Sequence, residues 1–179
     1  MKPASARIRL LSRTALLCAL LCILSVITLP IGAVPATLSL LGVFLCGLLL
    51  PTKNACLAVL GYLLLGAVGL PVFSSMQGGI GVLLGITGGY LWGYLPAVWV
   101  LSVLNTRLPR ISSHRFLSEI GASCAALLVC YTCGTVQFLC LTNSTVTTAL
   151  AVCVLPFLLP DLLKLAAARM LSRHFDRLL

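Results

Sequence analysis

Two charged residues, Asp161 and Lys164, lie three positions apart in the apolar segment 155–168 of the chain. On a helix, residues at i and i+3 share one face, so the carboxylate and the ammonium group can meet. A charged side chain inside a bilayer costs at least ~2.5–3.5 kcal/mol on insertion scales, so such residues normally face a partner or a cavity. The pair therefore predicts either an internal salt bridge that merely neutralises both charges or one wall of a ligand site.

The prolines beside this pair favour the ligand site. Pro156 and Pro160 each lack the N–H that a helix bond needs, so we expect a broken stretch at 155–160 and a helix that begins near Pro160 or Asp161. A broken backbone at membrane depth is tolerated where it lines a cavity or is buried in protein. Free N–H groups at the helix start and the charge of Lys164 would suit a carboxylate. Asp161 would orient Lys164 or accept hydrogen bonds from amide-like donors of the same ligand.

A glycine-rich segment is the second unusual feature. Gly85, Gly89 and Gly93 repeat every four residues, which lets two helices approach closely. The alternative is that the connector 72–84 covers a small ligand from the outer side. Thr87 and Tyr90 would then offer hydroxyl groups, and glycine would permit close backbone approach. The segment contains neither a P-loop nor a dinucleotide fingerprint, which argues against nucleotide binding.

The elements that position these residues follow from composition. Of 179 residues, 60% are hydrophobic and 8% are charged, whereas an ordinary soluble domain carries about 25% charged residues. This excludes a soluble globular domain, a disordered chain and a coiled coil. We expect an all-α membrane protein that forms one integral membrane domain over residues 1–179. The sequence shows no Ser/His/Asp or Cys/His arrangement, and the nine cysteines fall in or beside apolar segments, so neither an enzyme nor a metal site is expected.

Six membrane spans are expected, since a spanning helix needs about 20 apolar residues. The expected spans are 14–30, 36–50, 54–70, 85–105, 116–141 and 161–178, with a short interfacial helix at 144–154 and a turn at 31–35. The first span resembles a signal peptide, because basic residues precede it. Further apolar segments follow without a clean cleavage site, which favours a retained span.

The basic residues indicate the orientation of these spans. With the N-terminus inside, 11 of the 12 Lys and Arg residues lie at the inner ends of the spans, and Lys164 is the exception. The loops 31–35, 72–84 and 142–160 contain none. Lys and Arg collect in cytoplasmic loops, so both termini are predicted to be cytoplasmic in a multi-pass protein of the cell membrane. Nucleic acid is not an expected partner, because no basic stretch interleaves with exposed aromatic residues.

Ala15 and Ala19 form a small-xxx-small pattern on the first span. Small residues at this spacing let helices approach closely. The pattern predicts either packing inside the protein or docking against another membrane subunit.

Three blocks of the chain resemble the BioY family, the biotin-binding S components of energy-coupling factor (ECF) transporters. The blocks are GAVPATLSLLGVFLCGLLLP (32–51), GYLLLGAVGLPVF (61–73) followed by QGGIGVLLGITGGYLWGY (77–94), and VLPFLLPDLLK (154–164). They match in order and spacing, and the resemblance extends over about residues 14–170.

The resemblance implies an S-component fold of six helices and a biotin site that opens to the outside. It also implies docking onto a membrane T subunit with two cytoplasmic ATPases, so the chain itself would need neither a catalytic site nor a cofactor. The implied ligand-binding residues are Asp161, Lys164, Tyr90, Thr87, Gly88 and Gly89, and Gln77 is a further candidate. The implied partner-docking residues are Ala15 and Ala19.

Two positions depart from the family's pattern. Ile86 stands where the family usually has proline, and Pro160 stands where it usually has the glycine of Pro-Gly-Asp. The second departure bears on how the last helix begins. The candidates for apolar walls of the site are Trp92, Trp99, Phe73 and Tyr62, although membrane aromatics more often mark interfaces. The alternative functions are an S component for another small vitamin, a partner-independent carrier and a purely structural subunit.

Overall fold

The computed structural model describes residues 4–29, 36–107 and 115–178, most of which are helical. The helices are α1 (Ala4–Val26), α2 (Ser39–Leu49), α3 (Thr52–Ala67), the 3-10 helix η1 (Ser74–Met76), α4 (Ile80–Leu84), α5 (Gly88–Arg107), α6 (Arg115–Thr142), α7 (Val146–Cys153) and α8 (Leu155–Leu178). Two short strands, β1 (Thr28–Leu29) and β2 (Ala36–Thr37), pair antiparallel between α1 and α2. The predicted turn at 31–35 lies outside the described residues.

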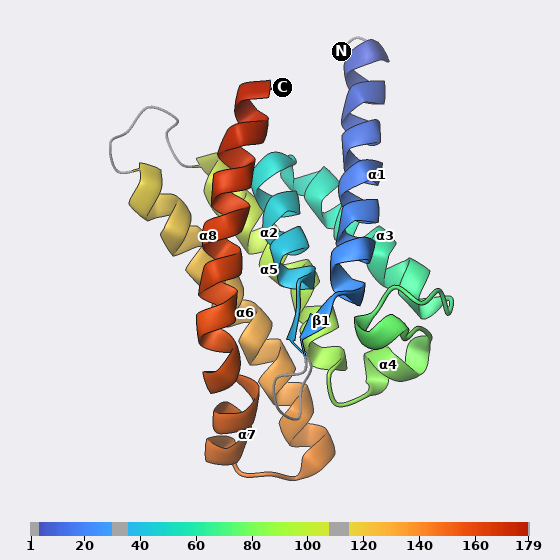
Figure 1. Ribbon diagram of the computed structural model, residues 1–179, viewed down its shortest axis with the longest axis vertical. Helices are drawn as coiled ribbons and strands as arrows, with labels where there is room; N and C mark the ends of the chain where they lie inside the picture. The colour runs from blue at the N-terminus through green and yellow to red at the C-terminus, as the bar shows by residue number, and fades with distance from the viewer. Residues whose placement is uncertain (1–3, 30–35, 108–114, 179) are drawn as a thin grey trace.

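Helix α2 lies in the middle of the bundle and packs against α1, α3, α5 and α8 (Figure 1). Its buried side chains point in every direction around its axis, as expected for a helix that is apolar all round. Phe44 of α2, Tyr62 of α3 and Leu101 of α5 are fully buried in the core that these helices share. Helix α6 packs along α5 on the side of the molecule away from α1 (Figure 1).

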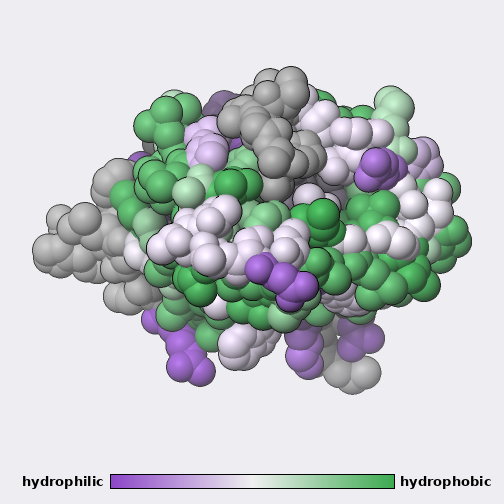
Figure 2. All heavy atoms as spheres, turned by 90° about the horizontal axis from the view of Figure 1, so that it is seen from below, coloured by the Kyte–Doolittle hydropathy of each residue, from purple (hydrophilic) through white to green (hydrophobic). Residues whose placement is uncertain are grey.

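Large hydrophobic side chains cover much of the outside of the bundle. Leu16 on α1, Leu64 on α3, Leu128 on α6 and Leu163 on α8 are each more than half exposed. Seen from the end that carries α4 and α7, hydrophobic residues alternate with pale, weakly polar ones, and only a few strongly hydrophilic residues are visible (Figure 2). So many exposed large hydrophobic side chains suit lipid rather than water.

Length and apolarity identify two helices of the described chain as membrane-spanning, within Ser5–Val26 and Glu119–Thr142, and a third if the bent pair α7–α8 is one span. The expected count of six stays a prediction. Helix α1 begins and α8 ends at the same end of the molecule (Figure 1). An even number of spans requires this arrangement, while the cytoplasmic location of that end stays a prediction.

The first helix begins about three turns earlier than expected, at Ala4 instead of residue 14. The expected boundary was placed where the apolar segment begins. Arg7, Arg9 and Arg13 are good helix formers, so the helix extends through them toward the N-terminus. The helix also ends earlier, at Val26, because the chain then enters strand β1. Hydropathy therefore located this span but misplaced both of its ends.

The expected broken stretch at 155–160 is wrong. The break is at Val154, where the backbone leaves the helical region (φ −121°, ψ −54°) and α7 and α8 meet at 40°. Pro156 falls in the first turn of α8, where an N–H is not needed. Pro160 lies inside the helix and deprives only the Pro156 carbonyl of its usual partner. Asp161 is therefore about 9 Å along the axis from the start of α8, too far for the free N–H groups there to serve an anion beside it.

The predicted close approach of two helices is confirmed for α5 and α6. A Cβ atom on Gly89 would lie 2.5 Å from the carbonyl oxygen of Cys133, and one on Gly93 would lie 3.0 Å from the Cys133 Cβ atom. Gly134 of α6 leaves room for the ring of Tyr90, since a Cβ atom there would lie 2.4 Å from the ring. The glycines thus bring α6 close enough for its side chains to join a site with those of α5 and α8.

Candidate ligand-binding site

A central cavity lies inside the bundle between α2, α5, α6 and α8. Its enclosed volume is about 70 Å³, and the space amounts to about 640 Å³ when the part open to solvent is counted. The central cavity is lined by Ser25, Thr37, Ser39, Leu40, Ser74, Thr87, Tyr90, Leu91, Tyr94, Cys130, Tyr131, Phe157, Asp161 and Lys164. Most of these side chains carry a hydroxyl group, and only Asp161 and Lys164 are charged.

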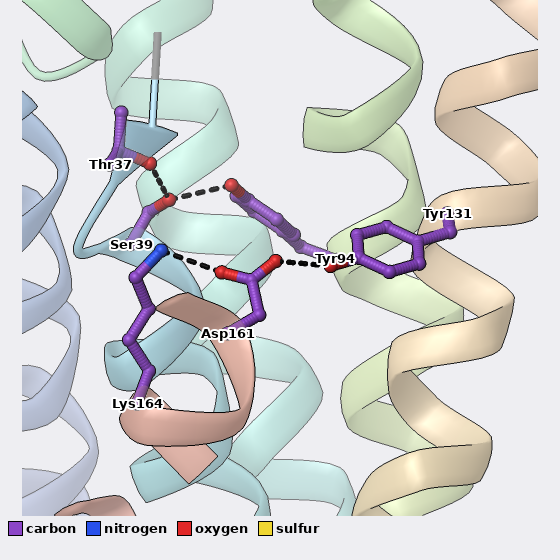
Figure 3. A network of polar contacts seen from close by, with 6 residues as sticks. All are labelled: Thr37, Ser39, Tyr94, Tyr131, Asp161 and Lys164. Atoms are coloured by element: carbon purple, nitrogen blue, oxygen red, sulfur yellow. Dashed lines mark hydrogen bonds and ion pairs between the residues drawn. The ribbon is translucent and has the colours of Figure 1, made fainter. Parts of the chain in front are cut away.

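The charged pair forms a salt bridge in the wall of the central cavity. The Lys164 Nζ atom lies 2.6 Å from Asp161 Oδ1, and both side chains are less than 10% exposed. The Tyr131 hydroxyl, from α6, donates to Asp161 Oδ2 at 2.6 Å (Figure 3). The predicted meeting of i and i+3 side chains is therefore confirmed. The pair is at once an internal salt bridge and part of a cavity, so its role toward a ligand stays a prediction.

Lys164 keeps hydrogen-bonding capacity that the salt bridge does not use. An ammonium group carries three N–H donors, and within the described chain Lys164 donates to Asp161 alone. Both oxygens of Asp161, in contrast, already accept one bond each. A ligand carboxylate or carbonyl could accept from Lys164 without breaking the pair.

Hydroxyl groups form a second network in the same cavity. Ser39, at the start of α2, shares a hydrogen bond of 2.6 Å with the Tyr94 hydroxyl of α5, and Thr37 of β2 bonds to Ser39 (Figure 3). The Tyr90 hydroxyl donates to the Cys153 carbonyl at 2.9 Å. These groups can each donate or accept, so the wall they form can hydrogen-bond to a polar, uncharged part of a ligand.

The structure brings together four of the predicted ligand-binding residues. Asp161, Lys164, Tyr90 and Thr87 all line the central cavity. The three others lie elsewhere: Gly88 and Gly89 pack against α6 and the end of α4, and Gln77 lines an open hollow on the surface. Thr87 borders both that hollow and the central cavity.

The aromatic residues expected as walls lie outside the central cavity. Phe73 and Tyr62 stack edge to face in the core, with ring centroids 5.4 Å apart, and Trp92 and Trp99 are about half exposed. The aromatic walls are instead formed by Tyr90, Tyr94, Tyr131 and Phe157.

Sequence reasoning missed Tyr94 and Tyr131, and it missed the small hydroxyl residues of the site other than Thr87. One signal was available, because the chain has only four tyrosines and three of them line the central cavity. The fourth, Tyr62, shares a hydrogen bond of 2.5 Å with the lining residue Ser25. Ser and Thr offered no comparable signal, since they occur throughout the apolar segments.

Ala15 and Ala19 are both exposed on α1, so they do not pack inside the described part of the chain. Ile8 and Ile23 on the same side of α1 are also more than half exposed. The small-residue pattern thus lies on an open apolar surface. Among the described residues, no group of three His, Cys, Asp or Glu side chains could hold a metal ion.

An apolar helical bundle that encloses a polar cavity with a buried ion pair defines a membrane protein that binds a small molecule. The BioY family model matches residues 1–179. A biotin transporter BioY of Thermotoga maritima is 35% identical over 95% of this chain and 97% of its own length. One from Rhodobacter capsulatus is 33% identical over 80% of each chain. The chain belongs to the BioY family.

A solved structure, the S-component for biotin from an ECF-type ABC transporter, has the same fold. It superimposes with a TM-score of 0.92 over 99% of this chain and 95% of its own, at 23% sequence identity. The S-component fold and the multi-pass membrane location expected from the sequence are therefore confirmed.

Proposed function

We propose that this chain is the substrate-binding membrane subunit of a biotin uptake system. It binds biotin from the outer side and delivers it inward together with an ATP-driven ECF module. The observation that carries the proposal is the central cavity, where Lys164 and Asp161 form a buried pair beside a hydroxyl-rich wall. Membership of a family whose relatives are named biotin transporters supports it, and a transporter subunit of this kind is not an enzyme.

The groups in the central cavity match the chemistry of biotin. Biotin carries a valerate carboxylate at one end and a ureido ring with N–H donors at the other. Lys164 has N–H donors available for the carboxylate, and Asp161 either positions Lys164 or accepts from the ureido group. Phe157 and the tyrosine rings supply apolar surface for the rest of the ligand.

A partner must supply the energy, because the sequence contains no P-loop. A T subunit with two ATPases fits this requirement, and the ECF-type relative of known structure supports such a module. The exposed surface of α1 around Ala15 and Ala19 is the proposed contact, since small residues let a partner helix approach closely.

Biotin should bind the purified, detergent-solubilised protein with a nanomolar dissociation constant, measured by calorimetry. Biotin methyl ester has the same ring and chain without the negative charge. If Lys164 holds the carboxylate, the ester should bind at least tenfold more weakly, a loss of about 1.4 kcal/mol. Other vitamins serve as controls. A folded protein that does not bind biotin, or that binds another vitamin more tightly, would contradict the proposal.

Bulky residues at the α1 surface should block transport but not binding. In the Ala15→Phe/Ala19→Phe variant, we expect ATP-dependent biotin uptake with the ECF module to fall at least tenfold, because two benzyl groups keep a partner helix at a distance. Calorimetric biotin affinity should stay unchanged, since neither alanine lines the central cavity. The matched control is Leu128→Phe/Val136→Phe on the exposed side of α6. Equal biotin uptake by both double variants would show that the docking site is not on this surface of α1.

A further inference from the structure

A second concave site lies on the outside of the bundle, between α3 and α5, and shares no residue with the central cavity. Six of its lining residues are Cys56, Leu57 and Leu60 of α3 and Leu95, Pro96 and Trp99 of α5. The remaining lining residue is Lys53, whose side chain is exposed. We call this site the α3–α5 groove. It is an apolar channel that carries one positive charge.

The positive charge lies at one end of the groove. The Ser102 hydroxyl of α5 donates to Thr52 Oγ1 of α3 at 3.2 Å, so the end of α5 lies beside the start of α3. Trp99, one turn before Ser102, is therefore close to the Lys53 end. Leu60 and Leu95 mark the other end, about 10 Å away along the axis of α3.

Among the side chains that the structure describes, no negative group offsets Lys53. The first turn of α3 contains no acidic residue, and Arg107 closes the neighbouring end of α5. The Asn54 side chain donates to Thr14 of α1, which places Arg13 of α1 at the same level. Glu119 and Asp161 each form an ion pair elsewhere in the described chain. This end of the groove is thus electropositive and would attract an anion.

We propose that the α3–α5 groove binds an acyl chain of an anionic phospholipid, with the headgroup phosphate at Lys53. The charge at one end and the apolar walls along the rest match a molecule that has a negative head and a hydrocarbon tail. The lining side chains other than Lys53 and Trp99 need no hydrogen-bond partner beyond weak thiol bonding, so a lipid chain leaves none of them unsatisfied. A protein helix is less suited here, because Leu57 and Trp99 are each more than half exposed and keep a second backbone at a distance.

Trp99 is a built-in reporter of this site. The chain has two tryptophans, so Trp92→Phe leaves Trp99 as the single fluorophore. The protein is reconstituted in bilayers that contain brominated phosphatidylglycerol or, at the same mole fraction, brominated phosphatidylcholine. Bromine quenches tryptophan only at short range. We expect phosphatidylglycerol to occupy the groove with a preference of about fivefold, the effect of one basic residue at an anionic lipid surface.

Lys53→Gln, in the Trp92→Phe background, should abolish that preference. The matched control, Arg9→Gln, removes an exposed charge of α1 outside the groove and should keep it. Equal quenching by both lipids, or a preference that survives Lys53→Gln, would overturn the proposal. Loss of the quenching on binding of the T subunit would also overturn the proposal, because the groove would then be a protein interface. If Trp92→Phe does not fold, native mass spectrometry can measure the phosphatidylglycerol that the Lys53→Gln and Arg9→Gln proteins retain. Loss of the lipid from Lys53→Gln alone supports the proposal, and equal retention by both overturns it.

Discussion

Replacing Lys164 with methionine is expected to reduce biotin affinity at least tenfold and to destabilise the empty protein. The substitution leaves Asp161 buried in the wall of the central cavity without its cation, and removing one partner of a buried pair costs about 3–5 kcal/mol. Calorimetry measures the affinity, and thermal unfolding in detergent measures the stability. Lys53→Met, which removes an exposed lysine away from the cavity, is the control and should bind biotin as the wild type does.

The affinities of the variants for biotin and for biotin methyl ester distinguish the two roles of Asp161, which either positions Lys164 or accepts from the ureido group. If Lys164 meets the carboxylate, Lys164→Met should weaken biotin strongly and biotin methyl ester only slightly. If Asp161 meets the ureido group, Asp161→Asn should weaken both ligands alike. The double variant Asp161→Asn/Lys164→Met should regain stability, since no lone charge remains, but not affinity. Wild-type affinity in the double variant would reduce the pair to a structural salt bridge.

Arg169→Met should produce the second large effect, a loss of about 3–5 kcal/mol in the free energy of unfolding. Arg169 of α8 forms an ion pair with Glu119 of α6, and both side chains are less than 10% exposed. The variant leaves the Glu119 carboxylate buried without this partner. Thermal unfolding without biotin measures the loss, and Arg9→Met, on the exposed side of α1, is the matched control.

Removing both charges should recover most of that stability. We expect Glu119→Leu/Arg169→Met to unfold within a few degrees of the wild type, because a buried pair exchanged for apolar groups is often neutral. Biotin affinity should be unaffected, since neither residue lines the central cavity. A single variant as stable as the wild type would show that this pair does not hold α6 and α8 together.

The charged half of the site was predictable because charge is rare in an apolar segment. Isolated charges are costly within a membrane helix, so the spacing of Asp161 and Lys164 alone predicted their contact. The hydroxyl half was not predictable. Thr14 and Ser123 bond back to carbonyls of their own helices, whereas Ser39 reaches Tyr94 across the bundle. Sequence does not distinguish these cases, since a hydroxyl group satisfies itself locally unless packing presents a distant partner.

The fold was predictable at the level of segments and less so at their ends. Hydropathy located each apolar segment because lipid selects for it, but α1 continues through basic residues that are good helix formers. The predicted start of α8 is wrong because Pro160 was expected at the first turn of the helix and lies inside it instead. The break at Val154 instead leaves both prolines where the helix tolerates them. Gly89 belongs to the packing of α5 against α6, a role that its four-residue spacing with Gly85 and Gly93 had suggested, whereas Gly88 packs mainly against Leu83 at the end of α4.

The neutrality of the Asp161–Lys164 pair affects the electrical work of moving the site through the membrane voltage. The empty site holds one positive and one negative group, so in the proposed transport cycle its return across the membrane would move no net charge through the transmembrane voltage. Loaded with a carboxylate, the same site carries one negative charge. Carrying that charge toward a negative interior costs about 2.3 kcal/mol per 100 mV. In the proposed cycle the inward step would therefore be electrogenic and the return step would not, so the voltage would oppose only the step that carries the ligand.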